Sequence, residues 1–264
     1  MGKFFGKPSY GQPEGAYSWQ HLLFVSVLLI IMVVLAVLLG LKNRNKEENV
    51  KNKVLIWAAF LIDGFELFKI AFNLGASRDA QSWKRDLPLF LCSLQLIAIP
   101  LAAFSKGRVR EASLDFVFIF GILSAITGTV GASQIYNAHP VLSFPTVVSG
   151  VTHTISGFAS LYIVFSKMES MKIKNLPIVL IILTVFCVLA YLANIAFDYN
   201  YMFLMKHEGT PYSIFYNLVG GSPVLYPIVV VLLFYIYAIG FTYVYNLIKN
   251  KKSKSEIIIE EVFE

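Results

Sequence analysis

Charged side chains are scarce in this 264-residue sequence, and their scarcity argues against a soluble fold. Asp, Glu, Lys and Arg make up 14% of the residues, whereas hydrophobic residues make up 57%. A soluble domain typically has about 25% charged residues. Apolar runs of roughly 18 or more residues, the length that marks a membrane-spanning helix, recur along the chain. The sequence therefore predicts an all-α, polytopic membrane protein, because helices satisfy their own backbone hydrogen bonds in lipid.

Cysteine is also scarce, and several common catalytic motifs are missing. Cys92 and Cys187 both lie inside apolar segments, so we expect no disulfide framework. The sequence contains no GxSxG motif, P-loop, dinucleotide fingerprint or metal-spaced His/Cys cluster, and we expect no metal and no cofactor. The net charge of +6 comes from short clusters beside the apolar runs. Membrane topology explains these clusters, so we expect no nucleic-acid partner.

Seven apolar segments predict a bundle of seven transmembrane helices. We interpret the whole chain as one integral membrane domain, with residues 1–20 outside, residues 21–248 in the bundle and residues 249–264 as a cytoplasmic tail. The third segment is the shortest and Pro100 interrupts it, so its boundaries are the least well defined of the seven. The seven segments are His21–Leu41, Val54–Leu74, Leu87–Phe104, Ser113–Ser133, Thr146–Phe165, Leu176–Phe197 and Pro223–Ile248.

The distribution of basic residues predicts the orientation of the bundle. The flanks on one side contain fifteen Lys and Arg residues, and those on the other side contain six. Cytoplasmic loops of membrane proteins carry an excess of Lys and Arg. We therefore expect the N-terminus outside, the C-terminus in the cytoplasm, and the protein in the cell membrane.

The second segment contains the densest set of polar side chains, Asp63, Glu66, Lys69 and Asn73. At helical spacing these four residues lie within an arc of about 120°, which must face protein or water. Glu66 and Lys69 are three residues apart and can form an ion pair. Ionisable groups inside a membrane often mark a functional site, although an ion pair that only fixes helix packing is equally consistent with this stripe.

The third segment, "LPLFLCSLQLIAIPLAAF", contains a thiol and an amide one helical turn apart, Cys92 and Gln95. A buried cysteine usually behaves as a small hydrophobic residue, and we interpret Cys187 in this way. A nucleophilic Cys92 would need a base, because only the thiolate is reactive. We expect Cys92 to lie too far into its helix for the helix N-terminus to help.

His153 is the base that we expect at the depth of Cys92. It lies on the fifth segment within a stripe of small residues, and such stripes let helices pack closely. A histidine in this position is costly without a partner, although it can be a hydrogen-bonded strut rather than a catalyst. The stripe consists of Ser149, His153, Ser156, Gly157 and Ser160.

Three stretches of the chain resemble a known family. "NYMFLMKHEGTPYSIFYNLVGGSPVLYPIVVVLLFY" (Asn200–Tyr235), "LPLFLCSLQ" and "HPVLSFPTVVSGVTHTISG" resemble motifs of the YwaF-type bacterial integral membrane proteins, which are related to the eukaryotic transmembrane protein 164 family. The resemblance extends from about Val54 to Ile248. It implies seven transmembrane helices.

In the eukaryotic relatives, a Cys–His pair is associated with acyltransferase activity on phospholipids. The resemblance carries these roles to Cys92 and His153. One position departs from the pattern, because many bacterial members have a histidine two residues before the cysteine, where this chain has Phe90. A mechanism that uses two histidines is therefore in doubt. His139 and His207 are expected in outer loops, and nothing ties them to the pair.

The leading hypothesis is a membrane-embedded acyltransferase in which Cys92, activated by His153, takes an acyl chain from a membrane phospholipid. A lysophospholipid or a lipoprotein amine would be the acceptor. Gln95, Lys69 and Asn200 are candidate donors to the oxyanion. We expect Asp63, Glu66, Asn73, Asn194 and Tyr201 to line or support the site.

Two alternatives remain open from the sequence. The first is a transporter or ligand-binding membrane protein that uses Asp63, Glu66, Lys69 and His153 as an ion or proton path. The absence of an evident inverted repeat weakens the symmetric-transporter version of this hypothesis. The second is a structural membrane protein whose buried polar groups only stabilise the packing.

Overall fold

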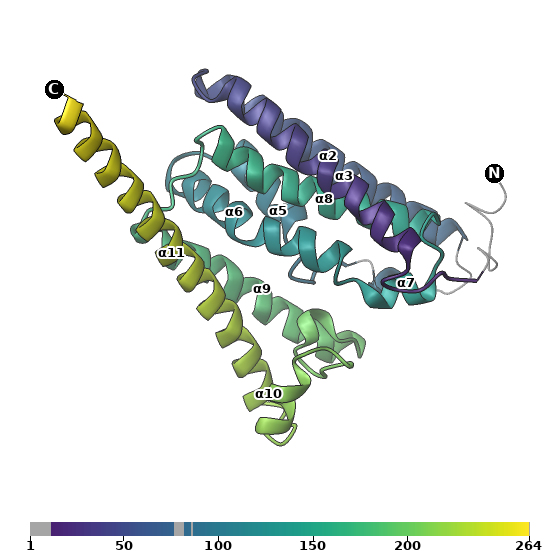
Figure 1. Ribbon diagram of the computed structural model, residues 1–264. Helices are drawn as coiled ribbons and strands as arrows, with labels where there is room; N and C mark the ends of the chain where they lie inside the picture. Colours follow the sequence, from purple (N-terminus) through teal and green to yellow (C-terminus); the bar gives the residue numbers. More distant parts are fainter. Residues whose placement is uncertain (1–11, 77–81, 86, 264) are drawn as a thin grey trace. The chain divides into compact units, whose positions relative to one another are not determined.

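The computed structural model describes residues 12–76, 82–85 and 87–263, and their regular elements are all helices (Figure 1). The chain divides into two compact units, Met1–Glu169 and Ser170–Glu264, and each is described by itself. Residues 1–11, in the predicted outer N-terminus, and residues 77–81 and 86, in the predicted connection between the second and third segments, lie outside the described residues. The prediction of a single domain stays a prediction.

Unit 1 is built from helices that correspond to the first five predicted segments (Figure 1). Its long helices are α2, α3, α6 and α8, and α5 is shorter. Two further short helices, α4 and α7, lie in the connections. The bounds are α2 Trp19–Asn43, α3 Glu48–Ala76, α4 Ser82–Arg85, α5 Gln95–Phe104, α6 Gly107–Thr129, α7 Ser133–Ala138 and α8 Phe144–Phe165.

Five helical stretches among the described residues are long and apolar enough to cross a membrane. The chain is thus a multi-pass helical membrane protein. The second predicted segment lies in α3, which has 29 residues but contains the charged side chains of Asp63, Glu66 and Lys69. The third predicted segment contains the ten-residue helix α5. The five stretches are Trp19–Asn43, Gly107–Ala138, Phe144–Phe165, Ile173–Phe197 and Leu225–Lys251.

The third predicted segment differs from the structure at its N-terminal end, because α5 begins at Gln95 rather than at Leu87. Pro88 has no amide hydrogen and disfavours a helical conformation in the residue before it. The chain then forms tight turns, in which the Gln95 amide donates to the Cys92 carbonyl at 3.4 Å and the Leu96 amide donates to the Ser93 carbonyl at 3.0 Å. Cys92 consequently lies in a turn before the helix.

Helix α8 packs against α2, α3 and α6, and glycines allow the close approach. An added Cβ at Gly150 would lie 2.9 Å from Leu28 of α2, and one at Gly121 of α6 would lie 2.8 Å from the Ser156 carbonyl oxygen of α8. The Ser160 hydroxyl of α8 also donates to the Phe118 carbonyl of α6 at 2.8 Å. The stripe of small residues on α8 therefore serves helix packing, as small residues commonly do in membrane bundles.

A buried hydrogen-bond network ties the other ends of these helices together. The hydroxyl of Tyr162, which is fully buried on α8, donates to the Lys51 carbonyl at 3.0 Å and accepts from the Asn43 amide at 3.1 Å. Nearby, Arg110 of α6 forms an ion pair with Glu48 of α3 at 2.6 Å. The buried network joins α2, α3 and α8 beside the α2–α3 connection, and the more exposed ion pair joins α3 to α6.

Unit 2 consists of two long helices, α9 (Leu176–Phe197) and α11 (Leu225–Phe263), which contact each other. The 3₁₀ turn η1 (Ile173–Asn175) leads into α9. The segment between the long helices contains the 3₁₀ turn η2 (Tyr201–Phe203) and the short helix α10 (Ser213–Leu218). The sixth and seventh predicted segments correspond to α9 and the first part of α11.

Removing the Tyr162 hydroxyl should destabilise unit 1. Tyr162→Phe leaves the Asn43 amide and the Lys51 carbonyl without this partner in a buried position, at an expected cost of about 1–3 kcal/mol. Thermal unfolding in detergent should show a lower melting temperature. Tyr243→Phe, at a tyrosine of α11 that is 48% exposed, is the matched control and should leave the melting temperature unchanged. Equal stability of the two variants would contradict the network.

Candidate functional site

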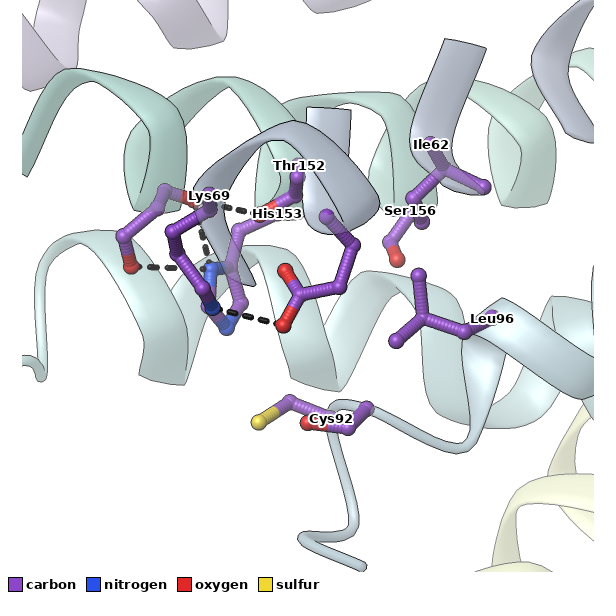
Figure 2. Close-up of a pocket in the computed structure, with 10 residues that line it drawn as sticks. Ile62, Lys69, Cys92, Leu96, Thr152, His153 and Ser156 are labelled. Atoms are coloured by element: carbon purple, nitrogen blue, oxygen red, sulfur yellow. Dashed lines mark hydrogen bonds and ion pairs between the residues drawn. The ribbon is translucent and has the colours of Figure 1, made fainter. Parts of the chain in front are cut away.

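A small pocket in unit 1 brings together side chains from three parts of the sequence. Figure 2 shows Lys69, Cys92, Thr152 and His153 around its polar end, with Ile62 and Leu96 at the apolar end. Its volume is about 50 Å³. Helix α3, the turn before α5 and helix α8 supply the lining: Ile62, Glu66, Lys69, Cys92, Ser93, Leu96, Ser149, Thr152, His153 and Ser156.

Cys92 is partly exposed and lines this pocket. Its side chain lies close enough to the imidazole of His153 and to the hydroxyl of its neighbour Ser93 for electrostatic coupling with both. The expectation that the helix N-terminus is too far away is wrong, because α5 begins three residues later, at Gln95. The N-terminal end of a helix carries a partial positive charge, which favours an anion such as a thiolate beside it.

The hydrogen bonds of His153 define which ring nitrogen is basic. Its Nδ1 atom lies 2.7 Å from the backbone carbonyl oxygen of Ser149, one turn earlier on α8. A carbonyl oxygen can only accept, so in the neutral ring Nδ1 carries the proton and Nε2 keeps its lone pair. A backbone carbonyl that holds Nδ1–H in this way fixes both the tautomer and the orientation of an imidazole.

The predicted ion pair between Glu66 and Lys69 is confirmed, and it lies in the pocket lining. The Lys69 Nζ atom is 2.6 Å from Glu66 Oε1, and the two side chains are 19% and 12% exposed, respectively. The ammonium group is also close enough to act electrostatically on the His153 imidazole. The pocket thus contains the Lys69 ammonium group, paired with the Glu66 carboxylate, together with the thiol and the imidazole.

The other predicted site residues of α3 and α5 lie outside the pocket lining. Asp63 and Asn73 are half-buried, on the same side of α3 as the ion pair, so the predicted polar stripe does face protein. Neither residue is part of the pocket lining. Gln95 is fully buried, and neither polar atom of its amide has a hydrogen-bond partner among the described residues. It also does not line the pocket.

Asn194, Asn200 and Tyr201 lie in unit 2, where both asparagine side chains bond to the backbone. The Asn194 amide donates to the Tyr201 carbonyl at 3.1 Å, and its Oδ1 atom accepts from the Tyr201 amide at 2.6 Å. The Asn200 side chain accepts from the Met205 and Lys206 amides. These bonds shape the turn after α9, in which Met202 has a positive φ of 55°.

The remaining cysteine and two other histidines have separate surroundings. Cys187 is buried in unit 2, where its thiol lies 3.8 Å from Met202 Sδ, in agreement with a packing role. His207 is also in unit 2 and accepts a hydrogen bond from the Gly209 amide at 3.1 Å. His139 follows α7 in unit 1, and it is not among the residues that line the pocket.

Sequence reasoning missed part of the site. Ser93 and Thr152 line the pocket, and Gly128 of α6 lies directly against the His153 ring. Ser149 and Ser156 were predicted only as packing residues, but they also line the pocket. Their spacing of four and three residues from His153 places them on its face of α8, and this signal was present in the sequence.

A family model matches most of the chain. The model of the TMEM164 family matches residues 16–248, which include most of each unit and every residue that lines the pocket. The chain belongs to the TMEM164 family. No match was found among curated proteins or among solved structures.

A double-mutant cycle tests the ion pair. Lys69→Met leaves the Glu66 carboxylate without its cation, at an expected cost of about 2–3 kcal/mol, below the value for a fully buried pair because both groups are partly exposed. Lys69→Met combined with Glu66→Gln should be more stable than Lys69→Met alone. Melting temperatures in detergent would provide the comparison. Strictly additive losses would mean that the two side chains do not interact in the folded protein.

Proposed function

We propose that the protein is a membrane-embedded acyltransferase that moves an acyl chain from a phospholipid through a thioester on Cys92. The observation that carries the proposal is that the Cys92 thiol and the His153 imidazole line the same small pocket, with the Nδ1 proton of the imidazole held by the Ser149 carbonyl. An activated thiol beside an oriented base is the arrangement that nucleophilic catalysis requires. Family membership is consistent with this function.

The first half of the reaction transfers the acyl chain to the enzyme. His153 Nε2 takes the proton of the Cys92 thiol, and the thiolate sulfur forms a bond to the carbonyl carbon of the donor ester. The ester C–O bond then breaks, and the leaving alkoxide takes the proton from the imidazolium. The products are a thioester on Cys92 and a lysophospholipid. Lys69 is the pocket cation that supports this step by stabilising the oxyanion.

The second half returns the enzyme to its starting state. An acceptor hydroxyl or amine attacks the thioester carbon while His153 takes its proton. The C–S bond breaks, and the thiolate recovers a proton from the imidazolium. Splitting the transfer in this way replaces one difficult step with two easier ones. A lysophospholipid and the amine of a lipoprotein are both acceptors with suitable chemistry.

The pocket is large enough to hold the reacting ester group, but not a whole phospholipid. A volume of about 50 Å³ holds a few water molecules or one ester group, whereas sites for drug-sized ligands start at about 300 Å³. The acyl chain and the head group would therefore extend beyond the pocket. Ile62 and Leu96 form its apolar end (Figure 2), which suits the first carbons of an acyl chain.

Substitution of Cys92 tests the acyltransferase directly. Cys92→Ala should abolish acyl transfer, since no thioester can form, and it should leave the melting temperature nearly unchanged because a small side chain is replaced by a slightly smaller one. Cys92→Ser should fit but also lack activity, because a hydroxyl is much harder to ionise than a thiol. The assay is release of radiolabelled lysophospholipid from a purified sample in vesicles of labelled phospholipid.

Cys187→Ala is the matched control, and it should retain full activity. A thiol-reactive lipid probe should label Cys92 selectively. Full activity of Cys92→Ala would reject the proposal, and it would leave the transporter hypothesis to be tested by substrate flux in sealed vesicles.

We also propose that seven helices cross the cell membrane, with the N-terminus outside. The five long apolar stretches together with α3 and α5 correspond to the seven predicted segments, and the excess of fifteen bases over six supports the orientation. A tag fused after Glu264 should resist external protease in intact cells and become accessible after permeabilisation. Its cleavage in intact cells would reverse the proposed orientation.

A further inference from the structure

Gly128 of α6 lies against the face of the His153 ring, so closely that no other residue type fits beside the ring as it stands. An ideal Cβ built on Gly128 would meet Cδ2, Nε2 and Cγ of His153, all at under 3.0 Å. Real Cβ atoms essentially never approach other atoms this closely. The three nearest atoms all belong to the imidazole. The absence of a side chain at position 128 therefore makes room for this ring, rather than for a close contact between the helix backbones.

The position of the ring leaves it little freedom to move aside. Its Nδ1 atom is held at 2.7 Å by the Ser149 carbonyl of its own helix. Nε2, the nitrogen that keeps the lone pair, is among the atoms that a Cβ at position 128 would strike. A methyl group there would therefore displace the basic nitrogen, or break the bond that orients it.

Other glycines of unit 1 have different neighbours. A Cβ at Gly121, two turns earlier on α6, would meet the Ser156 carbonyl and Ser160 of α8, so that glycine sets the distance between the helices. A Cβ at Gly64 of α3 would meet nothing within 4 Å. Glycine inside a helix is less favourable than alanine. Glycine at position 128 therefore lowers the local stability of the helix, and the space that it provides for the imidazole offsets this loss.

We propose that Gly128 is a positioning residue: by lacking a side chain, it lets His153 present Nε2 to the Cys92 thiol. This proposal rests on the proposed function, since it assigns Gly128 to the base of the acyl-transfer site. The residue acts through His153 and touches neither the thiol nor the substrate in the mechanism.

A double-mutant cycle in the full-length protein tests the proposal. Gly128→Ala should lower acyl transfer about 100-fold, because a general base typically contributes at least that factor. It should approach the activity of His153→Ala, and the double variant should be no less active than His153→Ala, since residues that act as a unit are not additive. The pH profile of Cys92 alkylation by N-ethylmaleimide, in a Cys187→Ala background, should become that of His153→Ala.

The melting temperature provides a second test, because Gly128→Ala should change it in opposite directions with and without the His153 ring. In the wild-type background, Gly128→Ala should lower the melting temperature. In the His153→Ala background it should raise it, because the ring is gone and alanine favours the helix. Gly64→Ala is the control, and it should retain full activity. If Gly128→Ala alone does not fold but the double variant does, the clash with the imidazole is supported directly.

Wild-type activity and an unchanged pH profile in Gly128→Ala, alongside a large loss in His153→Ala, would overturn the proposal. Failure of both Gly128→Ala and the double variant to fold would also overturn it, because the conflict would then not be with the ring. Full activity of His153→Ala would instead remove the proposed function. In that case, only the melting temperatures of Gly128→Ala with and without His153 would show whether Gly128 positions the ring.

Discussion

The close approach of α6 and α8 is the contact on which the rest of unit 1 depends. In a bilayer, lipid is as apolar as the side chains, so helices associate through close packing and hydrogen bonds rather than through the hydrophobic effect. Gly121 lets the backbones meet, and the Ser160 hydroxyl bonds across to the Phe118 carbonyl at 2.8 Å. The same approach brings Gly128 to the face of His153. The position of the imidazole is therefore a consequence of helix packing.

Against this pair of helices, the interrupted third segment completes the pocket. A regular helix from Leu87 would have put Cys92 among intrahelical hydrogen bonds, one turn inside its end. Because α5 begins at Gln95, the thiol lies in a turn at the helix N-terminus and lines the same pocket as the imidazole of α8. Helix α3 supplies the remaining charges through Glu66 and Lys69, which neutralise each other at 2.6 Å. A net charge exposed to lipid would be far more costly.

The sequence predicted the parts that follow from simple periodicity. Apolar length predicted the helices, and 100° per residue placed Glu66 and Lys69 on one buried face. Equal depth on two segments and the family resemblance also led us to expect Cys92 near His153. Both residues line the same pocket, and their catalytic pairing stays a prediction. Two features could not be predicted. The start of α5 depends on turns after Pro88 whose geometry is tertiary, and Gly128 resembles any other small residue of α6 until the ring of α8 is seen against it. Asn194 and Asn200 were predicted to support the site, and that prediction stays untested. Their side chains bond to backbone groups of the turn after α9, and sequence periodicity could not show these partners.

Several locally unfavourable features of unit 1 lie in or near one pocket. Their proximity is the strongest physical reason to regard the pocket as a functional site. The helix begins late beside Cys92, α6 has a glycine in its last turn beside His153, and an ion pair is retained in α3. One turn after the thiol, Gln95 is buried with an amide that finds no partner among the described residues. Each of these features is unfavourable on its own, and packing alone would be served better by an apolar helix without them. Proteins depart from locally consistent rules mainly where function requires it. The late start of the helix beside Cys92, the glycine against His153 and the ion pair of α3 lie in or next to a pocket of about 50 Å³. A shared chemical task accounts for their proximity better than independent accidents of packing.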